Sequence, residues 1–212
     1  MTKKTLPILV AAVTLVAISS FAPASPMTYH GMGYAQNVKL HSPDALADGL
    51  TVRAGQARIT WEDEDYLAYC VDIDHYIGSS EVTPISSLSL HNGDLAAYLF
   101  NTYADDVDSS LDAAALGVAI WEVVNETEST FDVSHEAGNF YISHNSNVLS
   151  AANNLLSTLP DSYIPDPDPI VLRSESKQDV MIRGEDQPVP EPATMAMLAL
   201  GGLGALLKRR SR

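Results

Sequence analysis

Cys70 is the only cysteine of the 212-residue chain, and it lies in the segment YCVDIDHYIG at residues 69–78. A cysteine is a good nucleophile when nearby positive charge favours its thiolate and solvent can reach it. A cysteine enclosed by apolar side chains packs instead as a small hydrophobic residue. Asp72 and Asp74 follow Cys70 at strand spacing and bring negative charge, which disfavours a thiolate. The segment therefore predicts a buried, inert thiol, with a reactive thiol as the alternative.

A second set of candidate ligands is a group of aspartates in the middle of the chain, namely Asp105, Asp106, Asp108 and Asp112. Carboxylate oxygens are the ligands that Ca²⁺ prefers, but the glycine and the terminal glutamate of a Ca²⁺ loop are missing. Acidic residues at the start of a helix are also ordinary caps. We expect capping here, with a weak Ca²⁺ site as the alternative, and no other cofactor.

Enzyme motifs are missing from the rest of the chain. The six histidines form no His-x-x-x-His pair, and there is neither a Gly-x-Ser-x-Gly elbow nor a phosphate-binding glycine loop. We therefore expect a protein that is not an enzyme.

The N-terminal residues 1–24 have the layout of a secretory signal peptide. Lys3 and Lys4 precede an apolar stretch over residues 6–18, and Ala22-Pro23-Ala24 is a small-x-small cleavage site. We expect the secretion machinery to export the chain and signal peptidase to cut after Ala24. An uncleaved membrane anchor is the alternative.

The C-terminal residues 189–212 have the features of a second targeting segment. They contain an apolar run over residues 193–207, which as a helix would extend about 22 Å, a marginal membrane span. The segment also carries a Pro-Glu-Pro tripeptide and a basic end: Pro190, Glu191, Pro192, Lys208, Arg209 and Arg210.

This order of parts resembles the PEP-CTERM sorting signal. The resemblance implies recognition by exosortase, a membrane-embedded transpeptidase of Gram-negative bacteria that make exopolysaccharide. The chain would be held in the inner membrane through residues 193–207, cut near the Pro-Glu-Pro tripeptide, and passed to the cell surface or extracellular matrix. A simple tail anchor is the alternative.

The exported body is strongly acidic. Residues 25–188 hold 26 acidic and six basic residues, a net charge near −20. Such a charge excludes nucleic acid and anionic lipid as partners bound by charge attraction. Without a second cysteine, the body must be stabilised by packing or by bound ions rather than by disulfides.

The pattern of the body predicts an α+β fold, with antiparallel strands at both ends and helices between. We expect a loose lead-in over 25–37, a body over 38–184 and a linker over 185–188. The predicted strands cover 38–42, 50–61 with a bulge at Gly55, 67–74 after an acidic turn, 170–174 and 178–183. The predicted helices cover 91–106, 106–126 and 147–160, and residues 130–134 and 139–143 are expected to form a hairpin.

Two stretches resemble motifs of the bacterial thioester domain, Tyr69-Cys70 and Ala119-Ile120-Trp121. In that family a glutamine two residues before Ala-Ile-Trp condenses with the cysteine into a thioester, which captures nucleophiles on a partner. Here that position is Gly117, which has no amide. The resemblance therefore implies a thioester-type scaffold without the thioester. The glycine suggests that Cys70 or a bulky neighbour approaches this helix closely.

Together these features predict an exported surface or matrix protein without enzymatic activity, which acts in adhesion or as a structural component associated with exopolysaccharide. A covalent adhesin that uses a Cys70 thioester with another partner residue is the alternative, and a secreted hydrolase ranks last.

Overall fold

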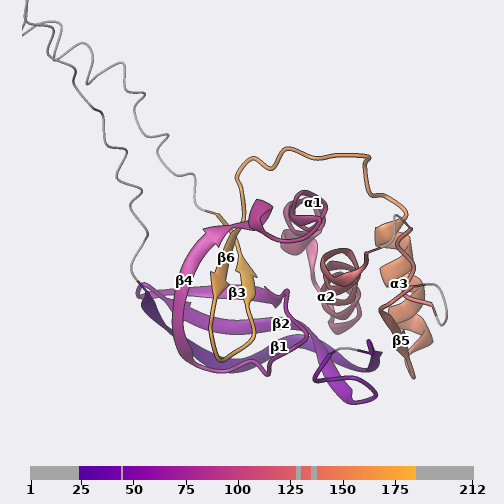
Figure 1. The fold of residues 1–212 in the computed structure, drawn as a ribbon, viewed down its shortest axis with the longest axis horizontal. Coiled ribbons are helices and arrows are strands. Elements are labelled where there is room, and N and C mark those ends of the chain that lie inside the picture. The colour runs from indigo at the N-terminus through magenta and orange to yellow at the C-terminus, as the bar shows by residue number, and fades with distance from the viewer. Residues whose placement is uncertain (1–23, 44, 128–129, 135–137, 185–212) are drawn as a thin grey trace, which may run out of the picture.

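The computed structural model describes residues 24–43, 45–127, 130–134 and 138–184. These residues form a mixed fold in which three α-helices lie against one side of a large antiparallel sheet (Figure 1). The predicted α+β class is confirmed, with most strands early and late in the chain and the helices between them. Residues 1–23 of the predicted signal peptide, the predicted linker and the predicted sorting segment lie outside the described residues.

The strands of the described part join into a ring. They are β1 (Ser25–His41), β2 (Thr51–Trp61), β3 (Glu64–Cys70), β4 (Ser80–Ser86), β5 (Tyr141–Ser143), β6 (Ile170–Arg173) and β7 (Val180–Ile182). Neighbours follow the order β1, β2, β3, β7, β6, β4, and β4 pairs again with β1. Residues Ser25–Met27 of β1 make this closure, whereas Lys39–His41 at its other end pair with β5.

The expected loose lead-in over residues 25–37 is wrong, because these residues belong to β1. Met27 is 1% exposed and pairs with Trp61 on one side and Ser80 on the other. The glycines that suggested a loop serve a bulge instead. Gly31 has a φ of 108°, and the register with β2 shifts between Tyr29 and Gly31.

The predicted irregularity at Gly55 is confirmed. Gly55 has a φ of 140°, and the β1–β2 register shifts opposite it, between Met32 and Ala35. A Cβ at Gly55 would lie 2.3 Å from the Tyr34 carbonyl oxygen, so the close approach of the two strands requires glycine.

Strand β3 differs from its predicted range at both ends. The acidic turn was expected over residues 62–65. Only Glu62 and Asp63, both with positive φ, separate β2 from β3. The strand ends at Cys70, so Asp72 and Asp74 do not continue its face as predicted.

The helices are α1 (Gly93–Tyr103), α2 (Ser110–Asn125) and α3 (Ser146–Leu156), with 3₁₀ turns η1 (Ser87–Ser89) and η2 (Ala104–Asp106). Helix α2 packs against β1, β2 and β3 on one side and against α1 and α3 on others, which explains why every residue from Ala113 to Val123 is buried. Ser109 is the N-cap of α2, and its side chain accepts the Asp112 N–H at 3.2 Å.

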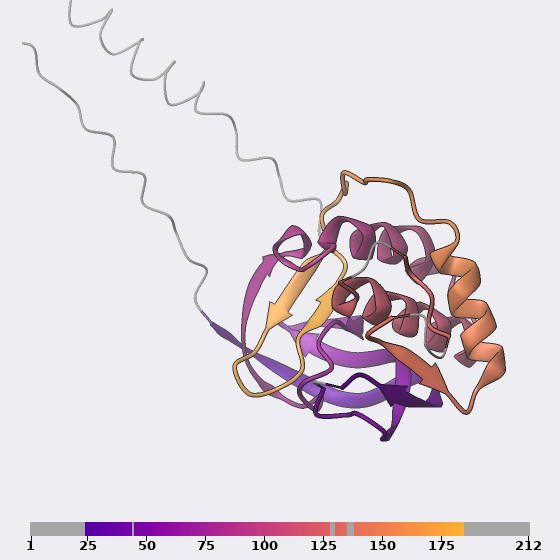
Figure 2. The ribbon, with the colours of Figure 1, turned by 45° about the vertical axis from the view of Figure 1, so that its right-hand side comes forward.

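The prediction that residues 130–134 and 139–143 pair with each other in a hairpin is wrong. Residues 141–143 form β5, which pairs with the end of β1, and the nearer segment contributes a single bond, Ile142 N–H to the Val133 carbonyl at 3.1 Å. After α3, the connector 157–169 passes over the helices to β6 (Figure 2). The buried core runs from Met27 to Ile182, so the body has a hydrophobic core of its own.

Candidate functional site

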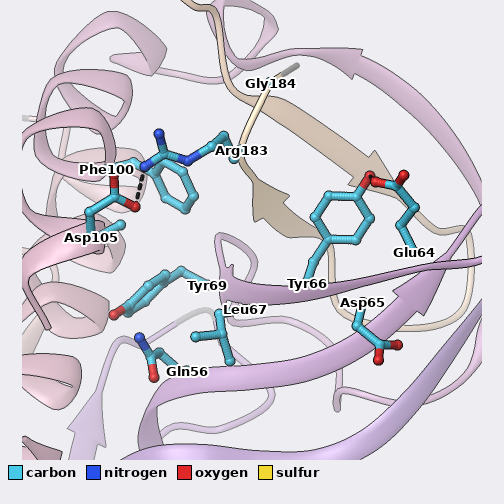
Figure 3. A pocket seen from close by; sticks show the side chains of 11 residues that line it. Gln56, Glu64, Asp65, Tyr66, Leu67, Tyr69, Phe100, Asp105, Arg183 and Gly184 are labelled. Carbon is cyan, nitrogen blue, oxygen red and sulfur yellow. Dashed lines mark hydrogen bonds and ion pairs between the residues drawn. The ribbon is translucent and has the colours of Figure 1, made fainter. Parts of the chain in front are cut away.

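A cavity of about 380 Å³ lies where strands β3 and β7 stop pairing (Figure 3). Only Tyr69 and Cys70 of β3 pair with β7, opposite Met181 and Val180, so β3 continues without this partner over residues 64–68. Helix α1 and turn η2 supply the next wall through Phe100 and Asp105, and the chain after β7 supplies the last. Side chains from both faces of β3 line the cavity, because no part of β7 covers this edge of the strand over residues 64–68.

Aromatic rings form the apolar part of the lining. The ring of Tyr69 meets that of Phe100 edge to face, with centroids 6.0 Å apart and an interplanar angle of 88°. Tyr66 lies on the other side of the cavity, where its ring packs 6.3 Å from that of Trp61 (Figure 3). Leu67, which is 53% exposed, completes the apolar surface.

The floor holds two buried polar side chains, Gln56 and Tyr69, which stand opposite each other on β2 and β3. The Tyr69 hydroxyl is buried without a hydrogen-bond partner in the described part of the chain. Burial raises the pKa of this hydroxyl, and the neighbouring Gln56 side chain opposes the rise. A buried hydroxyl without a partner costs about 1–3 kcal/mol, and the Gln56 amide opposite it is the group placed to offset that cost.

Charged groups surround the rim. Asp105 of η2 forms an ion pair with Arg183, which links the helical wall to the end of β7 (Figure 3). Glu64 accepts a hydrogen bond from the Tyr66 hydroxyl at 3.3 Å, and Asp65 accepts one from Thr60 at 2.6 Å. Glu64 and Asp65 thus each accept a hydrogen bond from a neighbouring hydroxyl.

This arrangement suits a neutral, hydroxyl-rich ligand. Aromatic faces pack against the apolar face of a sugar ring, and carboxylates, amides and guanidinium groups bond its hydroxyls. The cavity volume falls within the range of small-molecule sites, about 300–1,000 Å³. Three carboxylates against one guanidinium disfavour an acidic sugar.

The thioester-motif residues are not brought together as a reactive pair. The nearest atoms to a Cβ at Gly117 would be the backbone nitrogen of Gly55, at 3.1 Å, and the Tyr69 ring, at 3.7 Å. Because successive strand residues face opposite sides, Cys70 points away from the side on which Tyr69 meets position 117. The bulky neighbour expected beside Gly117 is therefore Tyr69.

Cys70 itself is a free, buried thiol. Burial first, and the Asp72 carboxylate second, raise the pKa of its thiol to about 12. Ala119 and Ile120 are fully buried in α2, and Trp121 is 4% exposed and packs on Phe140 with ring centroids 6.5 Å apart. All five motif residues thus lie in the hydrophobic core.

The four candidate Ca²⁺ ligands have separate surroundings. Asp105 pairs with Arg183, and Asp112 bonds to Ser109 as a cap, as expected. Asp106 lies by a groove between α2 and α3, and the structure gives no contact for Asp108. No cluster of three or more His, Cys, Asp or Glu side chains in the described ranges is arranged to hold a metal ion.

Comparison with known proteins adds one finding at the C-terminus. Residues 188–211 match the PEP-CTERM protein-sorting motif. The chain is an exported, exosortase-sorted protein. The match covers the predicted sorting residues and leaves the body without an assignment.

No curated protein and no solved structure matches the chain. The likeness of the body to a thioester domain therefore remains a resemblance of two short motifs. Within the described residues no helix is long and apolar enough to cross a membrane, and the predicted span over residues 193–207 lies outside them.

Sequence reasoning missed the cavity. Its lining comes from β2, β3, α1, η2 and the end of β7, and no two of these segments form a recognisable motif. The signal that was available is the pair of aromatic residues Tyr66 and Tyr69, which flank exposed Leu67 on a strand that follows an acidic turn.

Proposed function

We propose that the body is a non-enzymatic matrix or surface module that binds extracellular polysaccharide through the cavity beside β3. The observation that carries the proposal is a cavity walled by the rings of Tyr66, Tyr69 and Phe100 and rimmed by carboxylates. These are the groups that recognise the two faces of a sugar ring.

The position of the cavity supports this role. Gly184, the last described residue, lies in the cavity wall, and the sorting motif begins four residues later at position 188. A chain joined to the envelope or matrix through this end would hold the cavity close to the material around the attachment point.

The test is binding of the exported protein to oligosaccharides of different charge, measured by calorimetry. Neutral glucans and amino-sugar oligomers are expected to bind, whereas uronic-acid oligomers are expected to bind weakly because carboxylates outnumber the single arginine at the rim. Tyr66→Ala should weaken binding about three- to tenfold, the contribution of one aromatic stacking contact.

Tyr34→Ala is the matched control, since Tyr34 is a 49% exposed tyrosine outside the cavity lining. Equal losses in the two variants, or no binding of any oligomer, would overturn the proposal. Release of new reducing ends during incubation would identify a hydrolase instead of a binding module.

A further inference from the structure

A second cavity, of about 280 Å³, lies beyond the opposite end of β3. There the β1–β2 pair extends past the last residue of β3, and the segment 71–79 turns back toward it. The lining includes Met32, Val52, Ile73, Ile77 and Trp121, so most of its wall is apolar. Tyr76, which is 58% exposed, also lines it.

Hydrogen bonds hold the wall of this second cavity in place. The Val71 N–H donates to the Asp179 carbonyl at 3.0 Å, and the Gln178 N–H donates to the Tyr76 carbonyl at 3.3 Å. The Gln178 amide also donates to the Asp72 carbonyl. The cavity is therefore formed before a ligand arrives.

The polar residues that line this cavity include one exposed cation, Arg53, and one buried indole, Trp121. The Trp121 side chain is 4% exposed, and its indole N–H has no hydrogen-bond partner in the part of the chain that is described. Arg53 is exposed and takes part in no ion pair among the described residues. His75 lies beside them with its Nδ1 2.7 Å from Asp72.

The second cavity also differs from its surroundings in charge. Of the residues that line it, none in the described ranges is Asp or Glu, although the body holds 26 acidic residues. An apolar wall and a guanidinium without a carboxylate partner among the described residues together fit a ligand with an apolar body and a negative end.

We propose that this second cavity binds an amphipathic carboxylate, with its alkyl or aromatic body against the apolar wall, which includes the Trp121 ring, and its carboxylate toward Arg53. The proposal is independent of the polysaccharide site, because the two linings share no residue. Its ligand also has the charge that the first cavity disfavours.

The test follows the indole N–H signals of the ¹⁵N-labelled exported protein during titration with sodium decanoate below its micelle concentration. The chain has two tryptophans, and Trp61→Phe assigns their signals. The Trp121 signal should shift in a saturable manner. The Trp61 signal should stay in place, because its N–H already donates to the Ser25 hydroxyl at 2.7 Å.

Variants that remove one positive charge distinguish binding at a specific site from non-specific adsorption of decanoate. Arg53→Gln should weaken decanoate binding about fivefold, the loss of one exposed charge pair. Arg58→Gln, on the same strand but outside the cavity lining, should leave binding unchanged. Decylamine, with the same chain and the opposite charge, should bind more weakly than decanoate and be insensitive to Arg53→Gln.

An unshifted Trp121 signal would overturn the proposal. Parallel shifts of both indole signals, or equal effects of the two arginine variants, would show non-specific adsorption and overturn it as well. The unchanged Trp61 signal in each variant verifies that the fold is intact.

Discussion

The Glu122 side chain in the middle of α2 accepts the backbone N–H of Asp132 at 2.8 Å, which fastens the following loop to the helix. Glu122 is fully buried, and its second oxygen has no partner among the described residues. Glu126, one turn later, accepts the N–H groups of Thr127 and Asn139, at 2.7 and 2.8 Å. Two buried glutamates four residues apart thus hold both ends of this loop.

Glu122 should make the folded protein less stable as the pH rises. Its pKa is raised to about 8, mainly by burial, against the lowering effect of the Asp132 N–H and with a smaller contribution from the Glu126 and Asp132 carboxylates. From about pH 4.5 to 8 the unfolded chain releases this proton while the folded chain keeps it, so unfolding becomes easier by about 1 kcal/mol per pH unit. Urea unfolding at several pH values measures this slope.

Glu122→Gln separates this group from the rest of the acidic chain. Glutamine keeps an acceptor oxygen for the Asp132 N–H but does not titrate. The variant should gain stability relative to the parent as the pH rises from 5 to 8. Parallel pH profiles for the two proteins would show that Glu122 does not titrate in this range.

Much of the fold could be predicted from the sequence, because apolar spacing decides which helix is central. The run from Ala113 to Trp121 has no polar side chain, which favours a helix buried on most sides, and Ser109 is a residue type typical of a helix start. The prediction of a loose lead-in over residues 25–37 was wrong because it rested on amino-acid composition rather than on the alternation of buried and exposed residues. Its glycines suggested a loop, but Gly31 has a positive φ at a bulge within a long strand.

The cavity beside β3 could not be predicted in the same way, because its position depends on where two strands separate. Arg183 reaches Asp105 only because β7 leaves β3 after two residue pairs, and no local pattern encodes that separation. Glu122 did carry a signal. A glutamate that directly follows an apolar helical run must be buried with it, and a buried carboxyl needs partners.

Cys70 should remain unmodified in the native protein. The thiol is buried and its pKa is raised to about 12, so almost no thiolate forms between pH 7 and 9. We expect the intact mass of the exported protein to match the calculated value and to be unchanged by methylamine. Iodoacetamide should label the thiol only in denaturant. A mass short by one ammonia, restored with methylamine and lost in Cys70→Ala, would contradict this prediction and establish a covalent adhesin.

Gly117→Gln should not create a thioester, although it restores the residue type of the motif. The new side chain would start 3.1 Å from the Gly55 nitrogen and beside the Tyr69 ring, on the side opposite Cys70. We expect a loss of about 1–3 kcal/mol of unfolding free energy from overpacking. Ammonia loss in the mass spectrum of this variant would show instead that Cys70 can reach position 117.

Ser109→Ala should destabilise the protein by about 1 kcal/mol, because it removes the side chain that caps α2. The Ser109 hydroxyl accepts the Asp112 N–H at 3.2 Å, and alanine leaves that donor at the helix start without this partner. Ser110→Ala is the matched control, since Ser110 is the first residue inside the helix and alanine favours helix there. Urea unfolding of both variants measures the difference. Equal stabilities would show that water replaces the cap at no cost.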